Sequence, residues 1–151
     1  MKYKNQILEL IYAMLVILWS YASVTKLSNM ERSRLQMLNQ IFPPWIAEVL
    51  AWLVPLTELL LAILLLFRGT RPKALFGSLF LLVAFSGYVG LVMTGIFGRI
   101  PCSCGGILTG MSYSVHLVFN LCYTAIAAAG LYLQHHDFPY HTNNQQGKEA
   151  V

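Results

Sequence analysis

The chain has 151 residues, of which 57% are hydrophobic and only 11% are charged, whereas soluble domains carry about 25% charged residues. The apolar residues fall in long blocks with the charges between them, which excludes an ordinary soluble domain and predicts an integral membrane protein of one domain. The net charge of +4 is small, and basic residues in short loops favour a role in membrane orientation over nucleic-acid binding. Three cysteines are too few for a disulfide framework.

Four apolar segments are each long enough to cross about 30 Å of hydrocarbon as a helix of about 20 residues. They predict an all-α membrane protein in which a four-helix transmembrane bundle occupies residues 1–134. The polar residues 135–151 are expected to form a disordered cytoplasmic tail. The four predicted spans cover residues 7–24, 44–67, 73–97 and 114–133.

The first segment also has two features of a secretory signal peptide. Lys2 and Lys4 give it a basic start, and Ser20-Tyr21-Ala22 resembles a cleavage site. We expect a retained span instead, because Glu9 is unusual in a signal peptide and four spans place both termini on one side of the membrane.

The basic residues predict the orientation, since short cytoplasmic loops carry an excess of Lys and Arg. With both termini in the cytoplasm, that side holds six basic residues and the opposite side holds four. The cluster at residues 68–73 contributes most to this difference. We therefore expect a multi-pass protein of the bacterial cytoplasmic (inner) membrane, with Cys102 and Cys104 on the periplasmic or extracytoplasmic side, where disulfides persist.

A pair of cysteines, Cys102 and Cys104, lies between the third and fourth spans. With one residue between them they can close only a tight, strained disulfide, and strain makes such a bond more reducible. Pro101 before the pair and Gly105-Gly106 after it suit a tight loop, and Arg99 favours the reactive thiolate. We expect a redox-active pair, with a structural disulfide and a metal site as the alternatives.

Three polar or aromatic residues of the spans are further site candidates. His116 is the candidate for proton transfer during thiol exchange, because imidazole titrates near neutral pH; the alternative is a histidine that bonds a neighbouring helix. Glu58 lies roughly 21 Å along the second span, in mid-membrane, where an acid indicates a functional site. Glu58 and Trp52 are the candidates for lining a quinone pocket, and core packing is the alternative for Trp52.

Other polar residues predict ion pairs between the helices. Lys26 ends the first span at the depth of Glu48, so we expect these two to pair, because Glu58 lies much deeper. Glu9 lies near the cytoplasmic surface and is expected to pair with Arg68 or Arg71.

The third cysteine, Cys122, lies within the fourth span. It shares a face with Ala125 and Ala129, and we expect this face to pack against another helix, with Cys122 acting as a small hydrophobe.

Four motifs occur in a fixed order along the chain. The first span ends in Ala22-Ser23-Val24-Thr25-Lys26-Leu27, and the second contains Pro55-Leu56-Thr57-Glu58-Leu59-Leu60-Leu61. A Cys-x-Cys-Gly segment follows the third span, and Ser112-Tyr113-Ser114 opens the fourth, which continues to Asn120. Together these motifs resemble the MauE/DoxX-like family of small four-helix membrane proteins, particularly its redox-associated MauE branch, over residues 7–133.

The resemblance implies a bundle similar to those of DsbB and vitamin K epoxide reductase, which oxidise thiols with a quinone. It implies Cys102 and Cys104 as redox residues, Lys26 and Glu58 as family positions, and an exported thioredoxin-like or disulfide-containing partner. We therefore expect a membrane thiol–disulfide redox protein that passes electrons to a quinone. The alternatives are a non-enzymatic anchor or maturation subunit of a membrane complex, and a carrier of Cu or Zn on Cys102, Cys104 and His116.

Overall fold

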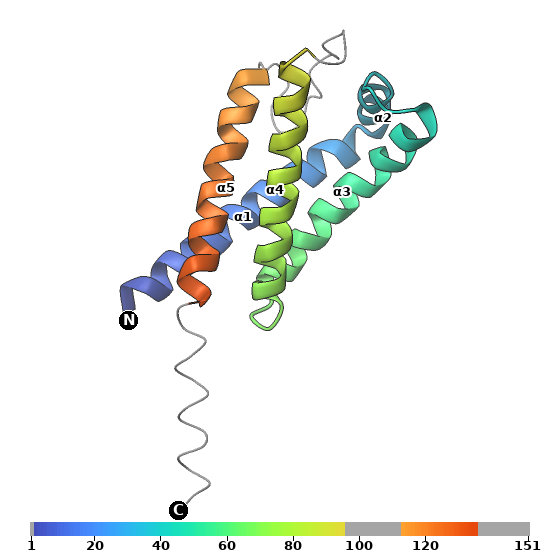
Figure 1. Ribbon diagram of the computed structural model, residues 1–151. Coiled ribbons are helices and arrows are strands. Elements are labelled where there is room, and N and C mark those ends of the chain that lie inside the picture. The colour runs from blue at the N-terminus through green and yellow to red at the C-terminus, as the bar shows by residue number, and fades with distance from the viewer. Residues whose placement is uncertain (1, 96–112, 136–151) are drawn as a thin grey trace, which may run out of the picture.

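The computed structural model describes residues 2–95 and 113–135. Within these two ranges the chain is entirely helical and contains no strand (Figure 1). Four of the helices are long and apolar enough to cross a membrane, so the predicted all-α fold with four spans is confirmed. The helices are α1 (Lys2–Ser28), α2 (Met30–Leu38), α3 (Pro44–Leu66), α4 (Arg71–Met93) and α5 (Tyr113–His135).

Proline and glycine set several helix boundaries. Pro44 stands in the first turn of α3 and Pro72 in the first turn of α4, where the missing N–H costs nothing because it has no partner inside the helix. Gly95 follows the C-cap of α4 with φ of +72°, a conformation that glycine adopts without a steric penalty. These residues therefore account for where α3 begins and for where α4 begins and ends.

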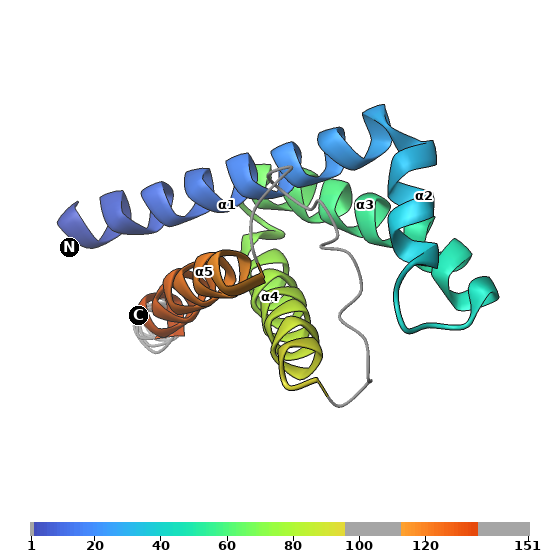
Figure 2. The ribbon, with the colours of Figure 1, turned by 90° about the horizontal axis from the view of Figure 1, so that it is seen from above.

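The spans form two pairs that cross. α1 packs most extensively on α3, and α4 packs most extensively on α5. Figure 2 shows α1 and α3 running side by side, with α4 and α5 crossing them at a steep angle. The core lies between the pairs and includes Leu15, Trp19 and Leu75. A buried hydrogen bond of 2.9 Å from Trp19 Nε1 to Ser78 Oγ joins α1 to α4.

The bundle has two distinct ends. The first residues of α1, the turn between α3 and α4 and the last residues of α5 lie at one end, which we call the turn end (Figure 1). Helix α2, the last residues of α4 and the first residues of α5 lie at the other, which we call the α2 end. The described chain stops at Gly95 and resumes at Tyr113, both at the α2 end, and residues 96–112, with Cys102 and Cys104, lie outside the described residues.

The outside of the bundle is strongly apolar. Large side chains such as Ile17, Phe80 and Val118 are more than half exposed, which in water would be unfavourable and in a bilayer is the expected lipid contact. The apolar helices and their exposed faces together describe a protein that resides in a lipid bilayer. The predicted polar tail, residues 135–151, lies almost entirely outside the described residues.

Candidate functional site: a buried ion pair among four spans

The most unusual feature inside the bundle is an ion pair between α1 and α3. Lys26 Nζ donates to Glu58 Oε1, and the Glu58 side chain is only 1% exposed. Pro55, one turn earlier in α3, is also buried. Burying both charges costs several kcal/mol per ion unless each meets its partner. An ionisable pair at this depth therefore indicates a functional site.

The structure corrects the predicted pairing of Lys26 with Glu48. Glu48 instead accepts from Arg34 of α2, and Lys26 pairs with the deeper acid. The physical reason is the additional helix α2, which continues the chain beyond α1 and packs against the first part of α3. The last turn of α1 therefore lies opposite the middle of α3, and α2 lies opposite its beginning.

Lys26 also connects the pair to α4. Its ammonium lies 5.8 Å from the centre of the Phe85 ring on α4, within the range of a cation–π interaction. Lys26 therefore links α1 to both α3 and α4. His116, the predicted proton-transfer residue, is half-buried and lies in the first turn of α5, near the α2 end.

Two further polar residues belong to this interior. Ser86 of α4 and Asn120 of α5 are 9% and 2% exposed. Within the described residues, Ser86 Oγ, Asn120 Nδ2 and Glu58 Oε2 are buried without a hydrogen-bond partner. Sequence reasoning did not assign Ser86 or Asn120 to a site. Two features of the sequence indicate them as candidates. Asn120 lies one helical turn after His116, and Ser86 carries a hydroxyl in a largely apolar span.

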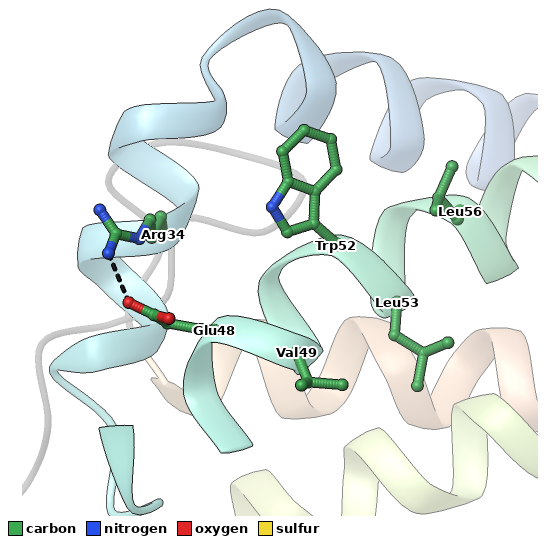
Figure 3. A pocket seen from close by; sticks show the side chains of 6 residues that line it. All are labelled: Arg34, Glu48, Val49, Trp52, Leu53 and Leu56. Atoms are coloured by element: carbon green, nitrogen blue, oxygen red, sulfur yellow. Dashed lines mark hydrogen bonds and ion pairs between the residues drawn. The ribbon is translucent and has the colours of Figure 1, made fainter. Parts of the chain in front are cut away.

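Trp52 lies in a different place from Glu58. Trp52 is 56% exposed and lines an open groove of about 490 Å³ between α2 and α3. Figure 3 shows Trp52 above the Arg34–Glu48 pair, with Val49, Leu53 and Leu56 continuing the groove along α3. Glu58 does not line this groove. The two residues predicted to line one quinone pocket are thus found in separate surroundings.

The remaining sequence-based candidates divide into three cases. Cys102 and Cys104 lie outside the described residues. Glu9 pairs with Arg71 Nη1 at 2.6 Å, which confirms one of its two predicted partners.

Cys122 is exposed rather than packed against another helix of the bundle, and the same is true of Ala125 and Ala129. The predicted packing face is therefore wrong for the single chain, because α5 turns Ala127 and Gly130 inward instead.

These features define a multi-span helical membrane protein with a polar interior near one end of its bundle. Residues 4–133 match the family described as Methylamine utilisation protein MauE, and the chain belongs to this family. The predicted membership is confirmed over all four spans. No curated protein and no solved structure matches the chain significantly.

Proposed function

We propose that the protein is a membrane thiol–disulfide redox protein whose reactive pair is Cys102 and Cys104. The observation that carries this proposal is the position of the pair, one residue apart on the connection between two adjacent spans. The spans on either side, α4 and α5, pack on each other, so this connection is attached to the bundle at a single place.

The exchange proceeds through a mixed disulfide. When the pair is reduced, one thiolate attacks a disulfide of the partner, and the partner's other sulfur leaves as a thiolate. The second cysteine of the pair then attacks the mixed disulfide, which oxidises the pair and releases the partner as a dithiol. Two electrons pass to the partner, and the reverse sequence returns them. His116, at the start of α5, is the base that accepts a thiol proton and later returns it.

The reverse sequence leaves the pair reduced. A quinone is the proposed electron acceptor that then oxidises the pair again. The quinone takes two electrons and two protons from the dithiol and leaves as a quinol, while the disulfide forms. The groove at Trp52 supports this step, because it offers an aromatic ring and a run of apolar side chains at the lipid-exposed side of α3. Glu58 belongs to the polar interior instead and is the proposed intramembrane acid of the same reaction.

The proposed location is the bacterial inner membrane with both termini in the cytoplasm. The α2 end, which holds the last residues of α4 and the first residues of α5, then faces the periplasm. The partner is an exported thioredoxin-like or disulfide-containing protein, and the description of the family points to one that serves methylamine utilisation.

A trapping experiment tests the proposal. Cys104→Ser removes the second cysteine, so an attack by Cys102 stops at the mixed disulfide. We expect membranes prepared without reductant to hold a covalent adduct of this variant, which reductant dissolves and mass spectrometry identifies. Cys122→Ser is the matched control and should change nothing. If neither loop variant, Cys102→Ser nor Cys104→Ser, forms an adduct, the proposed exchange is wrong.

The second candidate function is a non-enzymatic anchor or maturation subunit. The small exposed residues Cys122, Ala125 and Ala129 on α5 favour it, because small side chains allow another transmembrane helix to approach closely. Replacing Cys102 and Cys104 together with serine separates the two functions. Maturation of the partner is lost if the cysteines exchange disulfides, and it persists if the chain acts only as an anchor.

A further inference from the structure

We infer that the four spans enclose a hydrated polar chamber around Lys26 and Glu58, and that its water molecules carry protons between Glu58 and the α2 end of the bundle. Water is the molecule that we expect to bind in this chamber. This inference does not depend on the chemistry of Cys102 and Cys104.

The first observation is the set of unpartnered polar atoms. Glu58 Oε2, Ser86 Oγ and Asn120 Nδ2 come from three different helices, and all three residues are at least nine-tenths buried. A buried polar group without a partner costs about 1–3 kcal/mol in a protein interior, and hydrocarbon offers no compensation. Buried water, which makes about three hydrogen bonds to such groups, removes this cost.

The second observation is that two of these atoms, Ser86 Oγ and Asn120 Nδ2, belong to residues at the same distance along their helices from the α2 end. Ser86 is seven residues before the end of α4, and Asn120 is seven residues after the start of α5. At 1.5 Å per residue both lie about 10 Å below the α2 end, where the two helix ends are side by side (Figure 1). The Lys26 ammonium contacts Glu58 and faces the ring of Phe85, the residue before Ser86 in α4.

The third observation is the chemical balance of the site. Asn120 and Lys26 offer N–H donors, Glu58 Oε2 offers an acceptor, and the Ser86 hydroxyl serves as either. The ion pair has no net charge, so the site favours a neutral occupant that both donates and accepts. Water has this property. Among the described residues, the titratable group that contacts Glu58 is Lys26 from α1, and Phe85 of α4 lies against the same ammonium.

The proton path follows from this arrangement. A proton enters from water at the α2 end, passes along the chamber water, and binds Glu58 Oε2, the carboxylate oxygen that Lys26 does not occupy. It leaves by the same route. Glu58 thus serves as a proton store inside the membrane.

Cysteine accessibility tests the hydration. N-ethylmaleimide reacts with the thiolate, which forms only where water reaches the sulfur. We expect Ser86→Cys to be modified at least tenfold faster than Leu82→Cys, a buried control one turn away on α4. Asn120→Cys should likewise react faster than Ala127→Cys. Peptide mass spectrometry separates these sites from the native cysteines. Rates equal to those of the controls would overturn the chamber.

A second measurement tests proton binding on the unmodified sequence. Dicyclohexylcarbodiimide modifies carboxyl groups in membranes only when they are protonated. We expect Glu58 in the full-length protein to be labelled, with a rate that falls as pH rises, while the exposed Glu48 stays unlabelled. Glu58→Gln serves as the blank. Absence of label on Glu58 at every pH would show that Glu58 takes up no proton and would overturn the proposed path.

Discussion

At the scale of single residues, Lys26 and Glu58 stabilise the bundle only as a pair. Glu58 is almost fully buried and Lys26 is 14% exposed. Removing one partner of such a pair leaves an uncompensated charge, whereas replacing both by apolar groups of similar volume is often neutral or stabilising. Stability alone therefore does not require the pair.

We expect Lys26→Met to lower the free energy of unfolding by about 3–5 kcal/mol, because Glu58 then remains buried without its partner. The double variant Lys26→Met/Glu58→Met should recover most of that loss. Unfolding titrations in mixed detergent micelles measure both values. A double variant as unstable as the single one would contradict the view that the unpaired charge, and not lost packing, is the cause.

At the scale of the helices, α5 depends on one glycine for its contact with α1 and α4. A Cβ atom at Gly130 would lie 3.1 Å from Ile11 Cγ2 and 3.2 Å from Leu75 Cδ2. Both distances are tighter than ordinary van der Waals contact, so a larger side chain must push the helices apart. The close approach matters because α5 is the span with the smallest buried share.

We expect Gly130→Leu to cost about 1–3 kcal/mol, the usual range for an overpacked interior. Gly87→Leu is the matched control, because Gly87 is exposed on α4 and a Cβ atom there meets nothing within 4 Å. Thermal unfolding of the two purified variants provides the comparison. Equal melting temperatures for both variants would show that α5 does not pack on α1 and α4 as described.

At the scale of the whole molecule, the described chain begins and ends at the turn end of the bundle (Figure 1). The short connection between α3 and α4 lies at the same end. Arg68 in this connection and Lys73 in the first turn of α4 are exposed, whereas Arg71, which opens α4, pairs with Glu9. Exposed basic residues next to the spans favour the cytoplasmic side of the membrane for the loop near them. The proposed orientation therefore depends on these two residues more than on the arginine between them.

We expect a fluorescent protein fused after residue 135 to fluoresce, because it folds only when it remains in the cytoplasm, and alkaline phosphatase at the same place to be inactive. Arg68→Gln/Lys73→Gln reduces the basic residues on that side from six to four, equal to the other side. We expect this variant to insert in both orientations, with partial activity of both reporters. An active phosphatase fusion on the unaltered sequence would reverse the proposed orientation.

The sequence alone was sufficient for the number and order of the spans and for the family. Hydrophobicity along the chain is a local property, and lipid imposes a minimum length on each apolar block. The sequence also indicated Glu58 as unusual, because an acid in a run of leucines can be recognised without knowing its neighbours. The pairing of Glu9 with an arginine near residue 70 followed from their common depth.

Only the tertiary structure decided which side chains meet. Lys26 reaches Glu58, and Arg34 takes Glu48, because α2 displaces the end of α1 along α3. Phe85 of α4 lies against the Lys26 ammonium, and Ser86 and Asn120 turn inward from α4 and α5. These outcomes depend on axial offset and on rotation of each helix about its axis. Both are set by packing between helices, which a linear pattern of apolar residues does not specify.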